Sequence, residues 1–142
     1  AESRPENRIK HYDYSKEYII SSVENSLKNL QTEYLDIFLL HRPSPLMRAN
    51  EIAEAVEKLK ADGKILSFGV SNFTASQTAL IQSKTEVSFN QIQFSATHHD
   101  AMLDGSLDYM KLHKITPMAW NPLGVVFREN TEQTQRLKLL FS

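Results

Sequence analysis

Short apolar runs alternate with amphipathic segments along most of the chain. The first amphipathic segment begins at Lys16, where Ser15 is available as a helix cap. Apolar side chains at helical spacing give this predicted helix one buried face: Ile19, Val23, Leu27 and Leu30. The run that follows, residues 34–41, is short and rich in strand formers, and we expect a strand buried on both faces.

The same alternation then repeats. Amphipathic spacing predicts helices over residues 50–61, 75–83 and 105–113, and short apolar runs predict strands over residues 65–70, 87–94 and 116–120. Gly63 follows the first of these helices and is a typical stop. Asn130 and Gln133 fit a capping box that opens a last helix toward Leu140.

Strands that alternate with helices indicate repeated βαβ units and therefore an α/β fold with a parallel sheet. Right-handed crossovers put all helices on one side if the sheet curls, and on two sides if it doubles back. The periodicity does not give the strand order. Both an open doubly wound sheet and an arc of a (β/α) barrel therefore fit the pattern.

Composition narrows the class of partner. The chain has 142 residues, with 16 basic and 17 acidic side chains and a formal net charge of −1, so nothing in the charge predicts nucleic-acid binding. Its apolar runs are too short to span a bilayer, and we expect no membrane association. Cysteine is absent, which excludes a disulfide scaffold or thiolate metal site within the chain and is compatible with the cytoplasm, where we expect this protein.

Polar or aromatic residues stand at the carboxyl end of every predicted strand, where parallel α/β sheets bind ligands. In chain order they are His41, Ser71 with Asn72, Gln91, and Trp120 with Asn121, and the apolar Leu123 follows in the same segment. Each also has a purely structural interpretation. His41 could cap its strand, Ser71 and Asn72 could cap the next helix as Thr74 also could, and Trp120 could be core. Buried amides at Asn90 and Gln91 must either join strands or serve a ligand.

Other candidate chemistry is weaker. His98, His99 and Asp100 resemble a metal cluster in composition only, because adjacent side chains of an extended segment point apart. We therefore expect a solvated loop there and no metal site. The glycines form no phosphate-binding fingerprint of the G-x-G-x-x-G or Walker kind.

Together the strand-end motifs resemble the aldo-keto reductases, including the bacterial oxidoreductases of that family. LDIFLLHRPSPL is similar to the family's fourth barrel strand, KADGKILSFGVSNF to its fifth, FNQIQFS to its sixth, and MAWNPLG to its seventh. The resemblance implies part of an eight-stranded (β/α) TIM barrel, in one domain over residues 1–142. Residues 1–14 would be a surface loop, 15–124 the barrel core, and 125–142 a trailing loop and helix.

The resemblance also implies a reaction and a site. The parent reaction is hydride transfer between a nicotinamide, usually NADP(H) with NAD not excluded, and a small carbonyl or alcohol substrate. His41 would orient the carbonyl, Ser71, Asn72 and Gln91 would bond the nicotinamide carboxamide, and Trp120 would stack on the ring. Asn121 and Leu123 would line the path of the pyrophosphate. A stacked ring and amide contacts at the rim fix which face of the nicotinamide is presented.

One part of the family pattern is not matched. The family's proton donor is a tyrosine tuned by a lysine and an aspartate on the first three strands, and a tyrosine with a pKa of about 10 needs such tuning to act as an acid. Lys10, Tyr12, Asp13 and Tyr14 do not stand in that context, and we expect them to be loop residues. The chain by itself is therefore predicted to be inactive. The alternative is a non-catalytic, barrel-derived module that binds a cofactor or a protein.

A partial barrel also has consequences for assembly. Four parallel strands taken from a closed barrel leave two open sheet edges, and open edges pair with other chains. We therefore expect self-association, in its simplest form a dimer.

Overall fold

The computed structural model describes residues 12–140. Within them four parallel strands form one sheet in the order β1-β2-β3-β4. The strands are β1 (Leu35–Leu40), β2 (Ile65–Ser71), β3 (Phe89–Gln93) and β4 (Thr116–Trp120). Because consecutive strands are neighbours, the sheet is an arc of a (β/α) barrel and not a doubly wound sheet.

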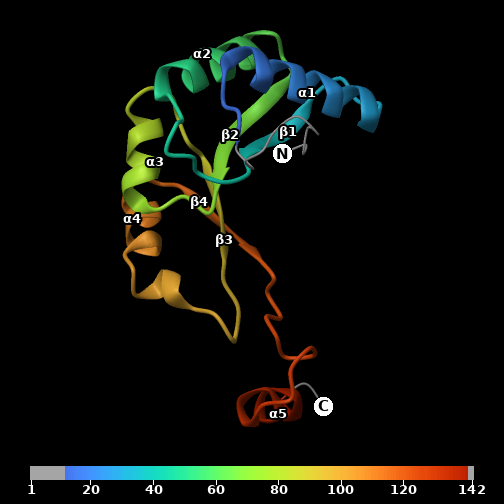
Figure 1. Ribbon diagram of the computed structural model, residues 1–142, viewed down its shortest axis with the longest axis vertical. Coiled ribbons are helices and arrows are strands. Elements are labelled where there is room, and N and C mark those ends of the chain that lie inside the picture. The colour runs from blue at the N-terminus through green and yellow to red at the C-terminus, as the bar shows by residue number, and fades with distance from the viewer. Residues whose placement is uncertain (1–11, 141–142) are drawn as a thin grey trace.

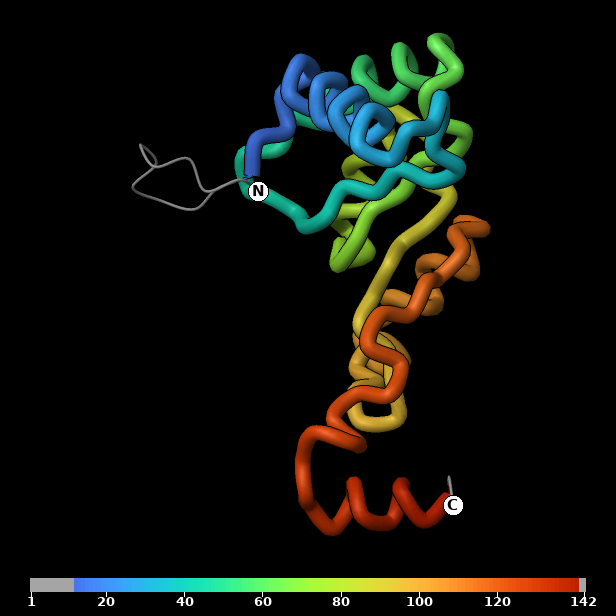
Figure 2. Tube along the Cα trace, turned by 90° about the vertical axis from the view of Figure 1, so that its right-hand side faces the viewer, coloured from blue at the N-terminus to red at the C-terminus, as the bar shows by residue number. Residues whose placement is uncertain are grey.

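The helices are α1 (Lys16–Leu30), α2 (Ala49–Ala61), α3 (Ala75–Gln82), the 3₁₀ helix η1 (Asp100–Met102), α4 (Ser106–Leu112) and α5 (Glu132–Leu139). Of these, α1 to α4 cover one face of the sheet. Contacts run from α1 to α2, from α2 to α3 and from α3 to α4. Figure 1 shows α1 to α4 following the sheet in this order. Helix α5 lies apart from the sheet, after the turns that follow β4, as the side view in Figure 2 also shows.

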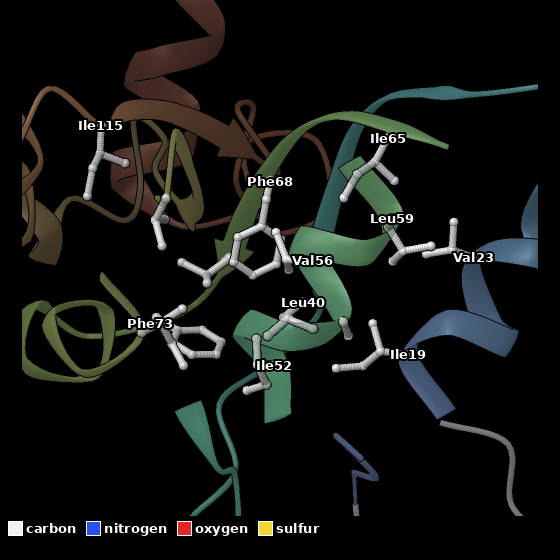
Figure 3. Packing of buried hydrophobic residues seen from close by; sticks show 14 of the residues in the cluster. Ile19, Val23, Leu40, Ile52, Val56, Leu59, Ile65, Phe68, Phe73 and Ile115 are labelled. Carbon is white, nitrogen blue, oxygen red and sulfur yellow. The ribbon is translucent and has the colours of Figure 1, made fainter. Parts of the chain in front are cut away.

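The core lies between these helices and the sheet. Helix α2 contributes one apolar stripe at helical spacing, and from β2 the fully buried Phe68 packs beside it (Figure 3). Val70 of the same strand is also fully buried. Gly63, with a positive φ of 69°, follows the Asp62 cap of α2 and turns the chain into β2 as predicted. Burial of each large apolar side chain contributes about 1.5–3 kcal/mol. The helices are therefore held on the face of the sheet from which Phe68 and Val70 project.

The predicted burial of β1 on both faces is wrong. Only Leu40 is buried, Asp36 is exposed, and the other residues of the strand are partly exposed. Helices cover one face of the sheet only, and β1 is an edge strand among the described residues, so its second face has no cover there. The predicted burial of Leu30 in the apolar stripe of α1 is also wrong. Leu30 is the last residue of that helix and is 65% exposed.

Several predicted element boundaries also need correction. Strand β3 is shorter than residues 87–94, and the capping box of α5 is formed by Thr131 and Thr134, not by Asn130 and Gln133. Ser15 does stand at the cap position of α1, but its side chain makes no capping bond; its backbone N–H donates to Asp13. Of the predicted surface loop, residues 1–11 lie outside the described part of the chain.

Gly69 allows three strands to meet closely. It pairs with Leu39 on one side and Phe89 on the other. A Cβ at this position would lie 2.6 Å from the backbone oxygen of Phe89 and 2.7 Å from a methyl carbon of Leu39. Leu39, Gly69 and Phe89 therefore share the face opposite the helices, because Leu40, Val70 and Asn90 alternate with them and are buried.

We predict that Gly69→Ala lowers the free energy of unfolding by about 2–3 kcal/mol, because the added methyl meets backbone that cannot give way. The matched control is Ser67→Ala, on the same strand and the same face, with an expected cost below about 0.5 kcal/mol. Chemical unfolding of both variants measures the difference. Equal stability of the two variants would show that the strands separate easily at Gly69.

Candidate active site

The predicted site residues lie along one edge of the sheet. Leu40 pairs with Val70, so the residues that follow them, His41 and Ser71, reach the same level at the carboxyl end. Ser71 pairs in turn with Gln91, and Gln93 pairs with Trp120. By strand alternation Ser71, Gln91 and Trp120 also share the face that the helices leave uncovered.

Four of these residues are joined by hydrogen bonds. The indole N–H of Trp120 donates to Oδ1 of Asn72 at 2.8 Å, and Nδ2 of Asn72 donates to the Ser71 hydroxyl at 3.0 Å. The Ser71 hydroxyl donates to the backbone oxygen of Gln91 at 3.1 Å, and the same oxygen accepts the backbone N–H of Asn72 at 2.8 Å. The ends of β2, β3 and β4 are therefore locked together by their own polar groups.

The chain turns sharply where β2 and β4 end. Asn72 and Asn121 follow the last residues of these strands directly, and both have a positive φ, 59° and 55°. Asparagine tolerates this left-handed conformation better than other residues with a Cβ. The turn at Asn72 is held from the core side, because Nδ2 of the buried Asn90 donates to the Phe73 oxygen at 2.9 Å. Asn90 thus joins structure, one of the two uses expected of the buried amides.

The structural alternative for Ser71 and Asn72 was a cap for the next helix. Thr74 provides that cap instead, since its side chain accepts from the backbone of Gln77 and the Gln77 side chain completes a capping box. The amide of Asn72 and the hydroxyl of Ser71 are consequently held at the sheet edge and not consumed by α3.

His41 lies at the far side of this edge, beyond β1. It is exposed, and the Tyr12 ring meets it edge-on with ring centroids 6.4 Å apart. Tyr12 stacks on Tyr14, whose hydroxyl donates to the backbone oxygen of Arg42. The two tyrosines, expected to be plain loop residues, therefore hold the segment around His41. Burial raises the pKa of Tyr14. Hydrogen bonding with the Arg42 backbone lowers this pKa by less, and the nearby Tyr12 raises it further.

Asn121 and Leu123 lie in the turns after β4, separate from the hydrogen-bonded four. The Arg128 guanidinium donates to Oδ1 of Asn121 at 3.0 Å and to the Gly124 oxygen at 2.8 Å, while Leu123 is 53% exposed. A Cβ on Gly124 would lie 1.9 Å from Oγ1 of Thr97, so glycine lets this loop rest on the loop that follows β3. Sequence reasoning missed Arg128, for which the only available signal was a basic residue shortly after a strand-end Pro-Leu-Gly.

The histidine loop has the solvated character expected of it. His98 and Asp100 are 3.8 Å apart and both side chains are accessible to solvent. The described residues contain no cluster of three or more His, Asp or Glu side chains with metal-site geometry. Within residues 12–140 no helix has the length and apolar character to cross a bilayer.

Comparison with known proteins gives the class to which this fold and edge belong. The model of the aldo/keto reductase family matches residues 5–138. The chain is 46% identical over 139 residues to the "Uncharacterized oxidoreductase YcsN" of Bacillus subtilis, covering 95% of this chain and 46% of that protein. The chain belongs to the aldo/keto reductase family.

Solved structures agree. A thermostable aldo-keto reductase in complex with the inhibitor epalrestat superimposes with a TM-score of 0.80 and 28% identity, over 89% of this chain and 47% of that one. An aldo/keto reductase from Klebsiella pneumoniae in complex with NADP and acetate gives a TM-score of 0.71 and 28% identity, over 82% of this chain and 44% of that one. The chain thus spans less than half the length of the relatives it matches.

We predict that Tyr14→Phe lowers the free energy of unfolding by about 1 kcal/mol, because the Arg42 oxygen loses its hydroxyl donor. Tyr12→Phe is the matched control. No hydrogen bond of its hydroxyl is found within the described residues, and its expected cost is below about 0.5 kcal/mol. Thermal or chemical unfolding measures both. If the control variant proves the less stable one, the anchoring role belongs to Tyr12.

Proposed function

We propose that this chain forms the nicotinamide-binding part of a cytoplasmic reductase that transfers hydride between NADP(H) and a small carbonyl or alcohol substrate. The hydrogen-bonded edge of Ser71, Asn72, Gln91 and Trp120 carries the proposal. NADP is favoured over NAD because the Klebsiella relative was solved in complex with NADP.

The residues at this edge suit a nicotinamide. Trp120 is partly exposed and is held at its N–H end, so a flat ring surface of fixed orientation borders the uncovered face. Within the described residues the Gln91 side-chain amide has no hydrogen-bond partner, which leaves it to serve a ligand beside Asn72. A bound reduced nicotinamide supplies the hydride, and these residues hold its ring and carboxamide in one orientation.

His41 is proposed to orient the substrate carbonyl. It is exposed at the same edge, and the Tyr12 ring restricts one side of its imidazole. An imidazole N–H can donate to a carbonyl oxygen and so assist hydride addition to the carbon. His41 directly follows β1, two strands away from β3, so the proposed substrate and cofactor contacts would come from different strands.

Asn121 and Leu123 are proposed to line the path of the cofactor pyrophosphate. The turns that carry them are fixed by Arg128 and by the seat of Gly124 on Thr97. The charge of Arg128, bonded here to two neutral oxygens, adds positive potential to this loop. The loop thus suits an anionic group without a glycine-rich fingerprint.

The resemblance implies a tyrosine of lowered pKa as the proton donor, and Tyr14 at this edge does not meet that requirement. A tyrosine acts as an acid near neutral pH only when its pKa is lowered, whereas burial raises the pKa of Tyr14. We therefore propose that the 142-residue chain by itself does not turn over, and that the reductase requires a proton donor from other residues of the enzyme.

The test titrates NADPH and NADH into the protein, expressed as its gene encodes it. Isothermal calorimetry measures the binding. We expect binding, and Asn72→Ala with Gln91→Ala should weaken it by about 10- to 100-fold, since two neutral hydrogen bonds are worth about 1–3 kcal/mol. The control is Gln133→Ala, an exposed glutamine of α5 away from this edge. Absence of binding of either nucleotide would refute the proposal. Binding without reduction of any carbonyl by a longer protein that contains this chain would favour the binding module, because no turnover is expected of the 142-residue chain by itself.

Self-association is a separate expectation for the 142-residue chain alone. Strands β1 and β4 are the two outermost strands of the described sheet, so each has one side without a paired strand there. One face of the sheet also carries no helix. We propose that copies pair through these edges. Sedimentation velocity at micromolar concentration should give a dimer or larger species. A well-behaved monomer at those concentrations would contradict it.

A further inference from the structure

One hydrogen bond at the site has a direction that chemistry alone determines. An indole N–H donates and cannot accept, so the atom of Asn72 that faces Trp120 at 2.8 Å must be its amide oxygen. The bond joins the ends of β4 and β2, two strands separated by β3. The amide nitrogen of Asn72 therefore faces the other way, toward Ser71.

The rest of the network follows from this direction. Nδ2 of Asn72 donates one hydrogen bond to the Ser71 hydroxyl oxygen. The Ser71 hydroxyl in turn donates a hydrogen bond to the Gln91 backbone oxygen. A side-chain amide has two N–H groups, so Asn72 retains a second N–H. Because Trp120 holds the amide oxygen, the group that Asn72 can still offer to a ligand is this N–H donor.

We propose that Trp120 is a positioning residue as well as a ring surface: its indole N–H orients Asn72 so that Nδ2 donates to the carboxamide oxygen of the nicotinamide. This inference rests on the proposed function. The backbone at Asn72 is fixed by its N–H bond to Gln91 and by its left-handed turn, so the free variable is rotation of the side-chain amide. The indole N–H can only donate and so fixes which end of the amide faces it, whereas the Ser71 hydroxyl could donate to an Asn72 oxygen if it gave up its own bond to the Gln91 oxygen.

Removal of the indole N–H therefore has a specific consequence. The Asn72 amide could then turn end for end, accept from Ser71 and present its oxygen to the carboxamide oxygen, which repels it. Trp120→Phe keeps an aromatic ring that stacks but loses the donor. Trp120→Leu loses both the ring and the donor.

The experiment measures dissociation constants for NADPH in the protein as it is encoded, by calorimetry, for Trp120→Phe, Asn72→Ala and the double variant. We expect Trp120→Phe to bind about fivefold or more weakly, in keeping with one hydrogen bond. In the Asn72→Ala background the same change should matter less than about twofold, because the group on which it acts is gone. Additive effects in the two backgrounds would overturn the inference.

A second measurement tests the polarity. The acetylpyridine analogue of NADPH keeps the carbonyl oxygen of the carboxamide and lacks its amino group. Trp120→Phe should weaken binding of the analogue by the same factor as binding of NADPH. A penalty that disappears with the analogue would mean that Asn72 accepts from the amino group, and the proposed polarity would be wrong.

Asn72→Asp keeps the inference testable if the tryptophan variants fold poorly. Its carboxylate still accepts from the indole but has no N–H to donate, so NADPH binding should weaken by at least about tenfold while the unfolding midpoint is retained. Unchanged affinity in Asn72→Asp or in Trp120→Phe refutes the positioning role and leaves the proposed function intact. Failure of the unaltered protein to bind NADPH or NADH refutes the proposed function itself.

Discussion

The parallel register of the four strands decides where every polar group at a strand end lies. Because β1 to β4 pair in chain order and run in the same direction, residues separated by dozens of positions meet at one edge. The register depends on close approach at Gly69, where any Cβ would strike the neighbouring strand. The small residue in β2 and the polar group that follows it, Ser71, thus belong to one arrangement.

Hydrogen bonds within the protein hold this edge from several sides. Asn90 holds the Phe73 turn from the core side, Thr74 takes over the capping of α3, and Trp120 reaches Asn72 across β3. The first two fix the backbone that follows Asn72, and the bond from Trp120 fixes the Asn72 side chain. Preorganisation of this kind reduces the entropy that binding must overcome. A rigid edge therefore fits a family in which one face of a ring has to be presented.

The two ends of the edge differ in character. The side of β3 and β4 is tightly bonded, whereas His41 lies exposed beyond β1 with tyrosines around it. In the proposed function the tightly bonded side would hold the cofactor and the exposed side would face the substrate. Because the chain spans less than half the length of its relatives, the groups that would complete the substrate side and supply the proton belong to the proposal for the whole enzyme.

Periodicity in the sequence determined the order and type of the elements, because helical and strand spacing are local properties of neighbouring residues. Position at or near strand ends also predicted Ser71, Asn72, Gln91 and Trp120 as candidate site residues. Local pattern could not give the strand order, the exposure of β1 or the anchoring of Tyr14, since these depend on what packs against each segment. Only the tertiary structure decided that the Trp120 indole faces Asn72, since that bond joins residues 48 positions apart.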